Sequence, residues 1–155
     1  MKERLVLGWE FCKDIERMAQ GLHSGNWSQV VGVLNGGALS ALVVANILKL
    51  PICWCRVNSY AEQKKKKALK VDPMDLSFVD FKGKEILVVD DIIDTRSTME
   101  TVIRILQAGG TSRINIWAPI IKVGGLSGIL DNYILERGSF LVVPQNCWVQ
   151  FPWEK

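Results

Sequence analysis

The 155-residue chain lacks any apolar run that approaches the roughly 20 residues needed to span a bilayer. Its first residues, MKERLVLGWEF, also lack the apolar core and the small-residue cleavage site of a signal peptide. These absences argue against membrane or secreted proteins, so we expect a cytoplasmic location and no membrane partner. The length predicts a single domain, residues 1–155, that is large enough for a proper hydrophobic core.

Histidine, paired cysteines and excess charge are also scarce. The sequence has one histidine and four scattered cysteines, with no CxxC pair. A zinc site would require all four thiolates to converge, so we expect buried, reduced thiols. A net charge of +3 is too small to indicate a nucleic-acid partner, although it suits an anionic substrate. The run Lys64–Lys67 has no interleaved aromatic or arginine side chains, which also argues against nucleic acid.

A short apolar run, Ile86–Val89, is rich in β-branched residues and does not alternate with polar ones. This pattern is typical of a strand that is covered on both faces of a parallel sheet. The run ends in Asp90 and Asp91, which we place at the open carboxyl edge of the sheet because the middle of a buried strand does not tolerate two carboxylates. Helical spacing follows, and Ser97 or Thr98 can cap that helix.

The turn between this strand and this helix holds an unusual density of polar groups. Residues 90–98 carry three carboxylates and three hydroxyls, on Asp90, Asp91, Asp94, Thr95, Ser97 and Thr98. Backbone N–H groups at a helix N-terminus bind phosphate, whereas the carboxylates need sugar hydroxyls or a metal as partners. An ordinary strand end with a helix cap explains one carboxylate but not the whole set. The turn therefore indicates a site for a phosphorylated sugar.

The remaining pattern alternates strands and helices. Strands are expected near 5–7, 30–34, 52–58, 86–89, 114–122 and 140–144, and helices over about 9–22, 38–48 and 98–106. This order predicts an α/β fold with a parallel sheet of about five strands flanked by helices. Between the second strand and its helix, Asn35-Gly36-Gly37 forms a second candidate anion site, because glycine lets the backbone approach a ligand closely. Residues 59–76 show no steady period and read as a flexible loop.

The segment Val88–Thr98, VVDDIIDTRST, resembles the phosphoribosyl pyrophosphate (PRPP) loop of the type I phosphoribosyltransferases. A hydrophobic strand, paired acids, two aliphatic residues and Asp-Thr-x-x-Thr all occur in the family's order. The family normally has glycine where this chain has Arg96. A left-handed backbone at that position would cost a non-glycine residue about 1–2 kcal/mol. Strong hydrogen bonds from a guanidinium to phosphate could offset this cost, so we expect Arg96 to help bind the ligand.

This resemblance implies a type I phosphoribosyltransferase-like fold and a set of site residues. It implies PRPP and phosphate binding by Asn35, Gly36, Gly37, Ser59, Tyr60, Asp90, Asp91, Asp94, Thr95, Arg96, Ser97 and Thr98. It also implies Mg²⁺ as cofactor, held by Asp91 with Asp90 as an alternative, and Asp94 as the general base. The purine enzymes of the family often carry a basic residue before Gly-Gly, where this chain has Asn35.

Two further features resemble the purine-using members. The strand after the PRPP helix ends in Lys122, which the resemblance makes a donor to the purine 6-oxygen. The tail Cys147–Glu154 resembles that of the bacterial xanthine-guanine enzymes, which implies that Trp148 stacks on the base and that the Val149 carbonyl accepts from a 2-amino group. Residues 144–155 would then form a purine-binding tail, part of a small hood built from both chain ends.

The implied function is purine salvage: transfer of ribose 5-phosphate from PRPP to guanine, xanthine or hypoxanthine, giving the nucleoside monophosphate and pyrophosphate. The partners would be PRPP, the purine base and the nucleotide, and the family resemblance implies a homodimer or homotetramer. The alternative is a non-catalytic nucleotide-binding regulator with the same fold, which Arg96 and Asn35 favour because they depart from the family pattern.

Overall fold

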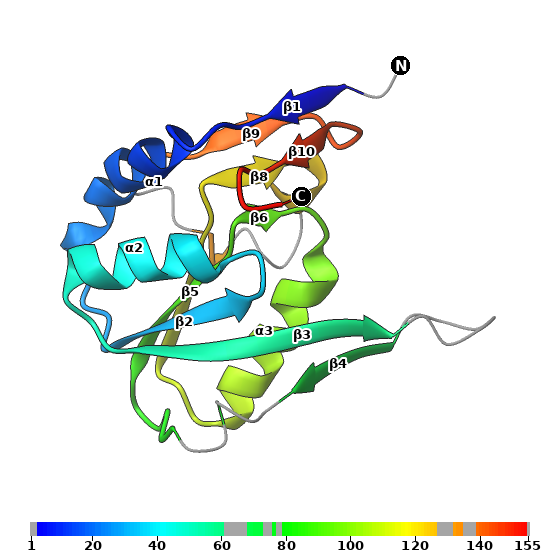
Figure 1. Cartoon of the computed structure of the whole chain (residues 1–155). Helices are drawn as coiled ribbons and strands as arrows, with labels where there is room; N and C mark the ends of the chain where they lie inside the picture. Colours follow the sequence, from blue (N-terminus) through cyan, green and yellow to red (C-terminus); the bar gives the residue numbers. More distant parts are fainter. Residues whose placement is uncertain are drawn as a thin grey trace.

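The computed structural model of the chain describes residues 3–60, 68–72, 76, 79–126, 132–134 and 139–154. Its central sheet has five strands in the order β4-β3-β2-β5-β7 (Figure 1). The strands are β2 (Gln29–Leu34), β3 (Ile52–Tyr60), β4 (Ala68–Asp72), β5 (Glu85–Val89) and β7 (Arg113–Trp117). Neighbours are parallel except for β3 and β4. The predicted α/β class with a central parallel sheet is confirmed.

Helices cover both faces of this sheet. The helical elements are α1 (Phe11–Ala19), η1 (Gln20–Ser24), α2 (Ala38–Leu48), α3 (Arg96–Ala108) and η2 (Val123–Leu126). In β5, Leu87 and Val89 pack in one core cluster with α1 and α2, whereas Ile86 and Val88 pack in a second cluster with α3. The predicted two-sided burial of this strand is therefore confirmed. Among the described residues, no helix has the length and apolar composition of a membrane span.

A smaller parallel sheet has the strand order β6-β8-β9. Its strands are β6 (Ile92–Ile93), β8 (Ile120–Lys122) and β9 (Leu141–Val143). The prediction of one strand over 114–122 is wrong, because Pro119 has no N–H group to continue a ladder. The chain therefore leaves the central sheet after Trp117 and enters the smaller sheet at Ile120. Asp90 and Asp91 make the equivalent break between β5 and β6, so both lie where the two sheets meet.

The two ends of the chain meet in a two-stranded parallel sheet of β1 (Arg4–Val6) and β10 (Trp148–Gln150). Leu5 lies opposite Val149, and both pack against the core cluster of α1 and α2. The ring of Phe151 continues this contact, with its centroid 6.1 Å from that of Phe11 and 4.9 Å from that of Trp153. The N- and C-terminal segments thus form the predicted small hood, while the purine-binding role of residues 144–155 stays a prediction.

The predicted flexible loop over 59–76 is wrong at both ends. Strand β3 continues to Tyr60, and β4 pairs with it in antiparallel register from Arg56↔Asp72 to Tyr60↔Ala68. The signal was present in the sequence, since apolar and charged residues alternate from Leu69 to Asp72, but it spans only four residues. The lysine run Lys64–Lys67 lies outside the described residues.

The cysteines do not converge on a metal site. Cys53 and Cys55 lie in the cluster with α3, whereas Cys147 lies in the other cluster. The pKa of the Cys55 thiol is raised to about 12, mainly by burial and to a lesser extent by the charge of the neighbouring Cys53. The expectation of buried thiols holds for these three, but Cys12 is only half-buried. Among the described residues, which include all four cysteines, no disulfide forms and no cluster of metal-ligating side chains occurs.

Candidate functional site

The acid pair Asp90-Asp91 is buried although both residues lie just after the end of strand β5. Asp90 is only 8% exposed and Asp91 only 6% exposed. The backbone N–H of Asp91 donates to Asp90 Oδ1 over 2.9 Å. Burial, and then the charge of Asp91, raises the pKa of Asp90 well above its ordinary value. Burial also raises the pKa of Asp91. Two carboxyls in this state favour a cation or sugar hydroxyls as partners.

The glycine loop after β2 lies directly against this acid pair. A Cβ at Gly36 would collide with the Asp91 carboxylate, and a Cβ at Gly37 would lie 2.8 Å from both Cα and Oδ1 of Asp90. The two strand-end loops therefore share one surface, as predicted from the parallel order of β2 and β5. Only glycine allows the backbone of one loop to approach the carboxylates of the other this closely.

We expect the ligand-free protein to lose stability as the pH rises, because Asp90 and Asp91 must then ionise while buried. A carboxyl whose pKa is higher in the folded than in the unfolded state binds its proton more tightly when folded. Its contribution to the free energy of unfolding therefore falls between the ordinary value of 3.8 and the raised pKa. Asp91→Asn should raise the urea midpoint, and by more at about pH 8 than at about pH 5.

Glu16→Gln is the matched control, because Glu16 is exposed and its substitution should leave the pH dependence unchanged. If Asp91→Asn lowers the urea midpoint at both pH values, the carboxylate stabilises the fold and the predicted cost of burying it is wrong.

A second group of polar side chains surrounds Asp94. Lys122, the buried last residue of β8, donates from Nζ to Asp94 Oδ2 over 2.8 Å. Gln145, just after β9, donates from Nε2 to the other carboxylate oxygen, Oδ1, over 2.9 Å. The Asp94 side chain is still 45% exposed, so a ligand can reach it. The structure thus brings the predicted base and the predicted purine donor into contact.

The residues that follow Asp94 begin α3. Thr95 is in the N-cap position with extended backbone (φ −116°, ψ 147°), and its Oγ1 lies 3.1 Å from Ser97 Oγ. The expectation that Ser97 or Thr98 caps this helix is wrong, because the helix already begins at Arg96. The backbone N–H groups of the first turn have no partner within the helix, and the exposed hydroxyls of Thr95 and Ser97 lie beside them. Phosphate binding by this turn stays a prediction.

Arg96 needs no left-handed backbone. It is the first residue of α3, and Lys49 is the only non-glycine residue with positive φ among the described residues. The expected conformational cost at this position is therefore absent. The Arg96 side chain is exposed, and within the described part of the chain it forms no hydrogen bond or ion pair, so it is available to a ligand.

Arg56 is a candidate site residue that the sequence did not reveal. It lies opposite Leu34 in the β2–β3 register, and its guanidinium donates to Asn35 Oδ1 over 3.3 Å. A positive charge therefore stands beside the Asn35-Gly36-Gly37 loop, although Asn35 itself is neutral. Only the pairing of β2 with β3 brings Arg56 to this loop, and no local motif marks it. Ser59 and Tyr60 lie further along β3, at its last two positions.

The tail residues behave differently from one another. Trp148 is 62% exposed, whereas Val149 is buried. The N–H of Trp148 donates to Glu3 and the carbonyl of Gln150 accepts from Leu7, so the Val149 carbonyl between them points away from β1. The end of the tail also lies near the acid pair. Burial is the largest cause of the raised pKa of Asp91, and the charge of Glu154 raises this pKa further. An exposed indole and an outward-facing carbonyl are thus available in the tail, whose residue Glu154 lies near Asp91.

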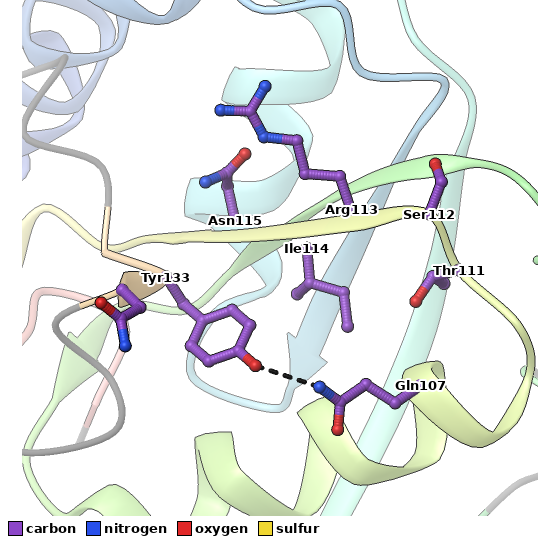
Figure 2. A pocket seen from close by; sticks show the side chains of 8 residues that line it. Gln107, Thr111, Ser112, Arg113, Ile114, Asn115 and Tyr133 are labelled. Atoms are coloured by element: carbon purple, nitrogen blue, oxygen red, sulfur yellow. Dashed lines mark hydrogen bonds between the residues drawn. The ribbon is translucent and has the colours of Figure 1, made fainter.

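A separate hollow of about 370 Å³ lies beside the first residues of β7. Figure 2 shows Arg113, Asn115 and Tyr133 around it, with Gln107 Nε2 donating to the Tyr133 hydroxyl over 3.0 Å. The lining includes none of the predicted site residues. Because β7 runs parallel to β5, its first residues lie at the opposite edge of the sheet from Asp90 and Asp91. Ligands of open α/β sheets bind at the carboxyl edge, so we assign the site to the acid-pair edge.

Comparisons with known proteins show the family of this chain. Residues 6–142 match the family described as "Phosphoribosyl transferase domain". The chain is 32% identical over 138 residues to xanthine-guanine phosphoribosyltransferase of Cereibacter sphaeroides, covering 87% of this chain and 74% of that protein. It is 26% identical over 157 residues to the enzyme of the same name from Chromohalobacter salexigens, covering 98% and 85%. The solved structure of a purine phosphoribosyltransferase from Pyrococcus horikoshii superposes with a TM-score of 0.81 at 25% identity, covering 100% of this chain and 95% of that one.

Proposed function

Because this chain belongs to the phosphoribosyltransferase family, we propose that it transfers ribose 5-phosphate from PRPP to N9 of a 6-oxopurine and releases pyrophosphate. One observation carries this proposal. The buried acid pair, the N-terminus of α3 and the Asp94–Lys122 pair all lie at the carboxyl edge of the sheets. Relatives named xanthine-guanine phosphoribosyltransferase support the same reaction.

Three neighbouring surfaces would hold PRPP. The first turn of α3, with Thr95, Ser97 and Thr98, binds the 5-phosphate through backbone N–H groups and hydroxyls. Asp90 and Asp91 accept from the ribose hydroxyls. The Asn35-Gly36-Gly37 loop binds the pyrophosphate through its amides, and Arg56 beside it offsets part of the negative charge. Ser59 and Tyr60 at the end of β3 would extend this last surface.

The acid pair also fits Mg²⁺, with Asp91 as the ligand and Asp90 beside it. Carboxylate oxygens are the ligands that this ion prefers, and it is commonly held by one or two carboxylates together with substrate oxygens and water. Among the described residues no group of three or more His, Cys, Asp or Glu side chains could hold a metal ion, so substrate oxygens and water would supply the remaining ligands. When bound, the ion neutralises charge on the leaving pyrophosphate.

The reaction exchanges one bond at C1 of the ribose. N9 of the base forms the new bond to C1 as the bond from C1 to the pyrophosphate oxygen breaks, and pyrophosphate keeps that electron pair. The N7 proton of the base passes to the Asp94 carboxylate, which leaves a neutral purine in the nucleotide. Backbone amides of the glycine loop stabilise the charge that develops on the leaving group.

The purine would lie against the tail. Trp148 stacks on the ring, the outward-facing Val149 carbonyl accepts from a 2-amino group, and Lys122 donates to the 6-oxygen. A base without a 6-oxygen cannot accept from Lys122, so adenine should be a poor substrate. A homodimer or homotetramer remains part of the proposal.

The regulator alternative loses the two features that favoured it. Arg96 lies in an unstrained helical turn, and Arg56 supplies the positive charge that Asn35 lacks. The test is pyrophosphate release after mixing protein, Mg²⁺ and PRPP with each base separately. We expect release with guanine, xanthine or hypoxanthine and little with adenine or orotate. Tight PRPP binding without release for any base would favour the regulator.

Arg96→Gln should weaken binding of PRPP and of the product nucleotide by roughly 10- to 150-fold, because a hydrogen bond from a charged group to phosphate is worth roughly 1.5–3 kcal/mol. The loss should be larger at low salt, where screening is least. Arg96→Gly should bind no more tightly than Arg96→Gln, since the backbone at this position is already helical. Calorimetric titration of each protein measures its affinity for PRPP and for the product nucleotide.

Arg104→Gln is the matched control, an exposed arginine further along the same helix whose loss should leave affinity unchanged. Tighter binding by Arg96→Gly than by the wild type would mean that Arg96 impairs the phosphate site.

A further inference from the structure

We propose that Gln145 is a positioning residue that holds the Asp94 carboxylate ready to accept the purine proton. The proposal rests on the function above, in which Asp94 is the base. Gln145 Nε2 donates to Asp94 Oδ1 over 2.9 Å and lies 3.4 Å from the backbone carbonyl oxygen of the same residue. One side-chain amide therefore contacts both the carboxylate and the backbone of the proposed base.

The other end of the Gln145 amide is fixed as well. The backbone N–H of Gly124 donates to Gln145 Oε1 over 2.9 Å. A Cβ at Gly124 would collide with Oε1, so a larger residue there would move the Gln145 amide out of its present position. Since Gly124 follows Lys122 by two residues, Gln145 connects the segment that carries the purine donor to the residue that carries the base. An amide fixed at Oε1 presents its donor in one direction only.

This connection matters because Lys122 would donate to two acceptors, the Asp94 carboxylate and the purine 6-oxygen. Lys122 Nζ contacts Asp94 Oδ2 over 2.8 Å. When Lys122 turns to the purine 6-oxygen, its hydrogen bond to Oδ2 weakens, and that oxygen becomes available to the N7 proton. Gln145 still holds Oδ1, so the carboxylate keeps its orientation. Orientation within the site is valuable, since a displacement of about 1 Å can cost on the order of a hundredfold in rate.

Gln145→Glu separates this role from a structural one. The glutamate keeps an oxygen that can accept from the Gly124 N–H, but it loses the N–H donor to Asp94 and places a second carboxylate beside it. We expect kcat to fall roughly 10- to 100-fold, with the KM for PRPP nearly unchanged. Gln145→Met loses the contacts to both Gly124 and Asp94, so its kcat should fall at least as far.

The decisive measurement is a double-mutant cycle with Asp94→Asn, which removes the charge that Gln145 positions. If Gln145 acts through Asp94, adding Gln145→Glu to Asp94→Asn should lower kcat no further. Gln107→Glu is the matched control, because Gln107 is exposed and donates to Tyr133 at the opposite edge of the sheet. Its kcat should equal that of the wild type.

The possible outcomes separate the two proposals. A wild-type kcat in Gln145→Glu together with a loss in Gln145→Met would mean that Gln145 only anchors Gly124, and additive losses in the cycle would likewise overturn the positioning role. Both results leave the transfer reaction intact. Absence of turnover in the wild type would instead overturn the proposed function itself.

Discussion

Asp94→Asn is expected to lower kcat by roughly 10²-fold or more, the usual contribution of general acid–base help. The amide cannot accept the N7 proton of the purine, yet it retains the shape of the carboxylate. It also keeps an oxygen for Lys122 or Gln145, both of which donate to Asp94. Folding should therefore be preserved, and the KM for PRPP should change little. Steady-state kinetics with circular dichroism of both proteins measures this.

Asp14→Asn is the control, since Asp14 pairs with Arg17 on α1, outside the proposed site. It should match the wild type in kcat. An Asp94→Asn protein with wild-type kcat would remove Asp94 from the chemistry, and with it the positioning role of Gln145.

Trp148→Ala is expected to raise the KM for purine by roughly 5- to 150-fold, because stacking of a base on an aromatic ring is worth about 1–3 kcal/mol. The KM for PRPP should change far less. Trp148 is 62% exposed, so its removal should scarcely lower the melting temperature. Initial-rate kinetics with each substrate varied in turn measures the two KM values.

Trp153→Ala provides the comparison for packing. The ring of Trp153 stacks on Phe151 at a centroid distance of 4.9 Å. Trp153→Ala should therefore lower the melting temperature more than Trp148→Ala does. Equal effects of Trp148→Ala on both KM values, or a large loss of stability alone, would show that the Trp148 indole packs in the hood.

Local sequence patterns predicted the elements that form through local chemistry. The apolar run Ile86–Val89 predicted the buried strand β5, because its composition is typical of a strand that is buried on both faces. The apolar stretch after Gly36-Gly37 gave α2 with the predicted bounds, 38–48. The convergence of the glycine loop with Asp90 followed from one rule, that parallel strands share a carboxyl edge.

The features that sequence reasoning missed depend on pairing between distant segments. Arg56 reaches the glycine loop only through the register of β3 against β2. Gln145 reaches Asp94 only because β9 joins the smaller sheet beside β8. Neither residue belongs to a motif, so no spacing in the sequence marks it. The helix start at Arg96 was also missed, because three candidate hydroxyl residues lie within four positions.

The central claim is that this protein makes a new bond between ribose C1 and a purine. Mass spectrometry of a single-turnover mixture of protein, Mg²⁺, PRPP and guanine tests it most directly, with Asp94→Asn beside the wild type. We predict nucleoside monophosphate and pyrophosphate in equal amounts from the wild type, and far less of both from the variant. Calorimetric binding of PRPP without any nucleotide product from guanine, xanthine or hypoxanthine would contradict the account.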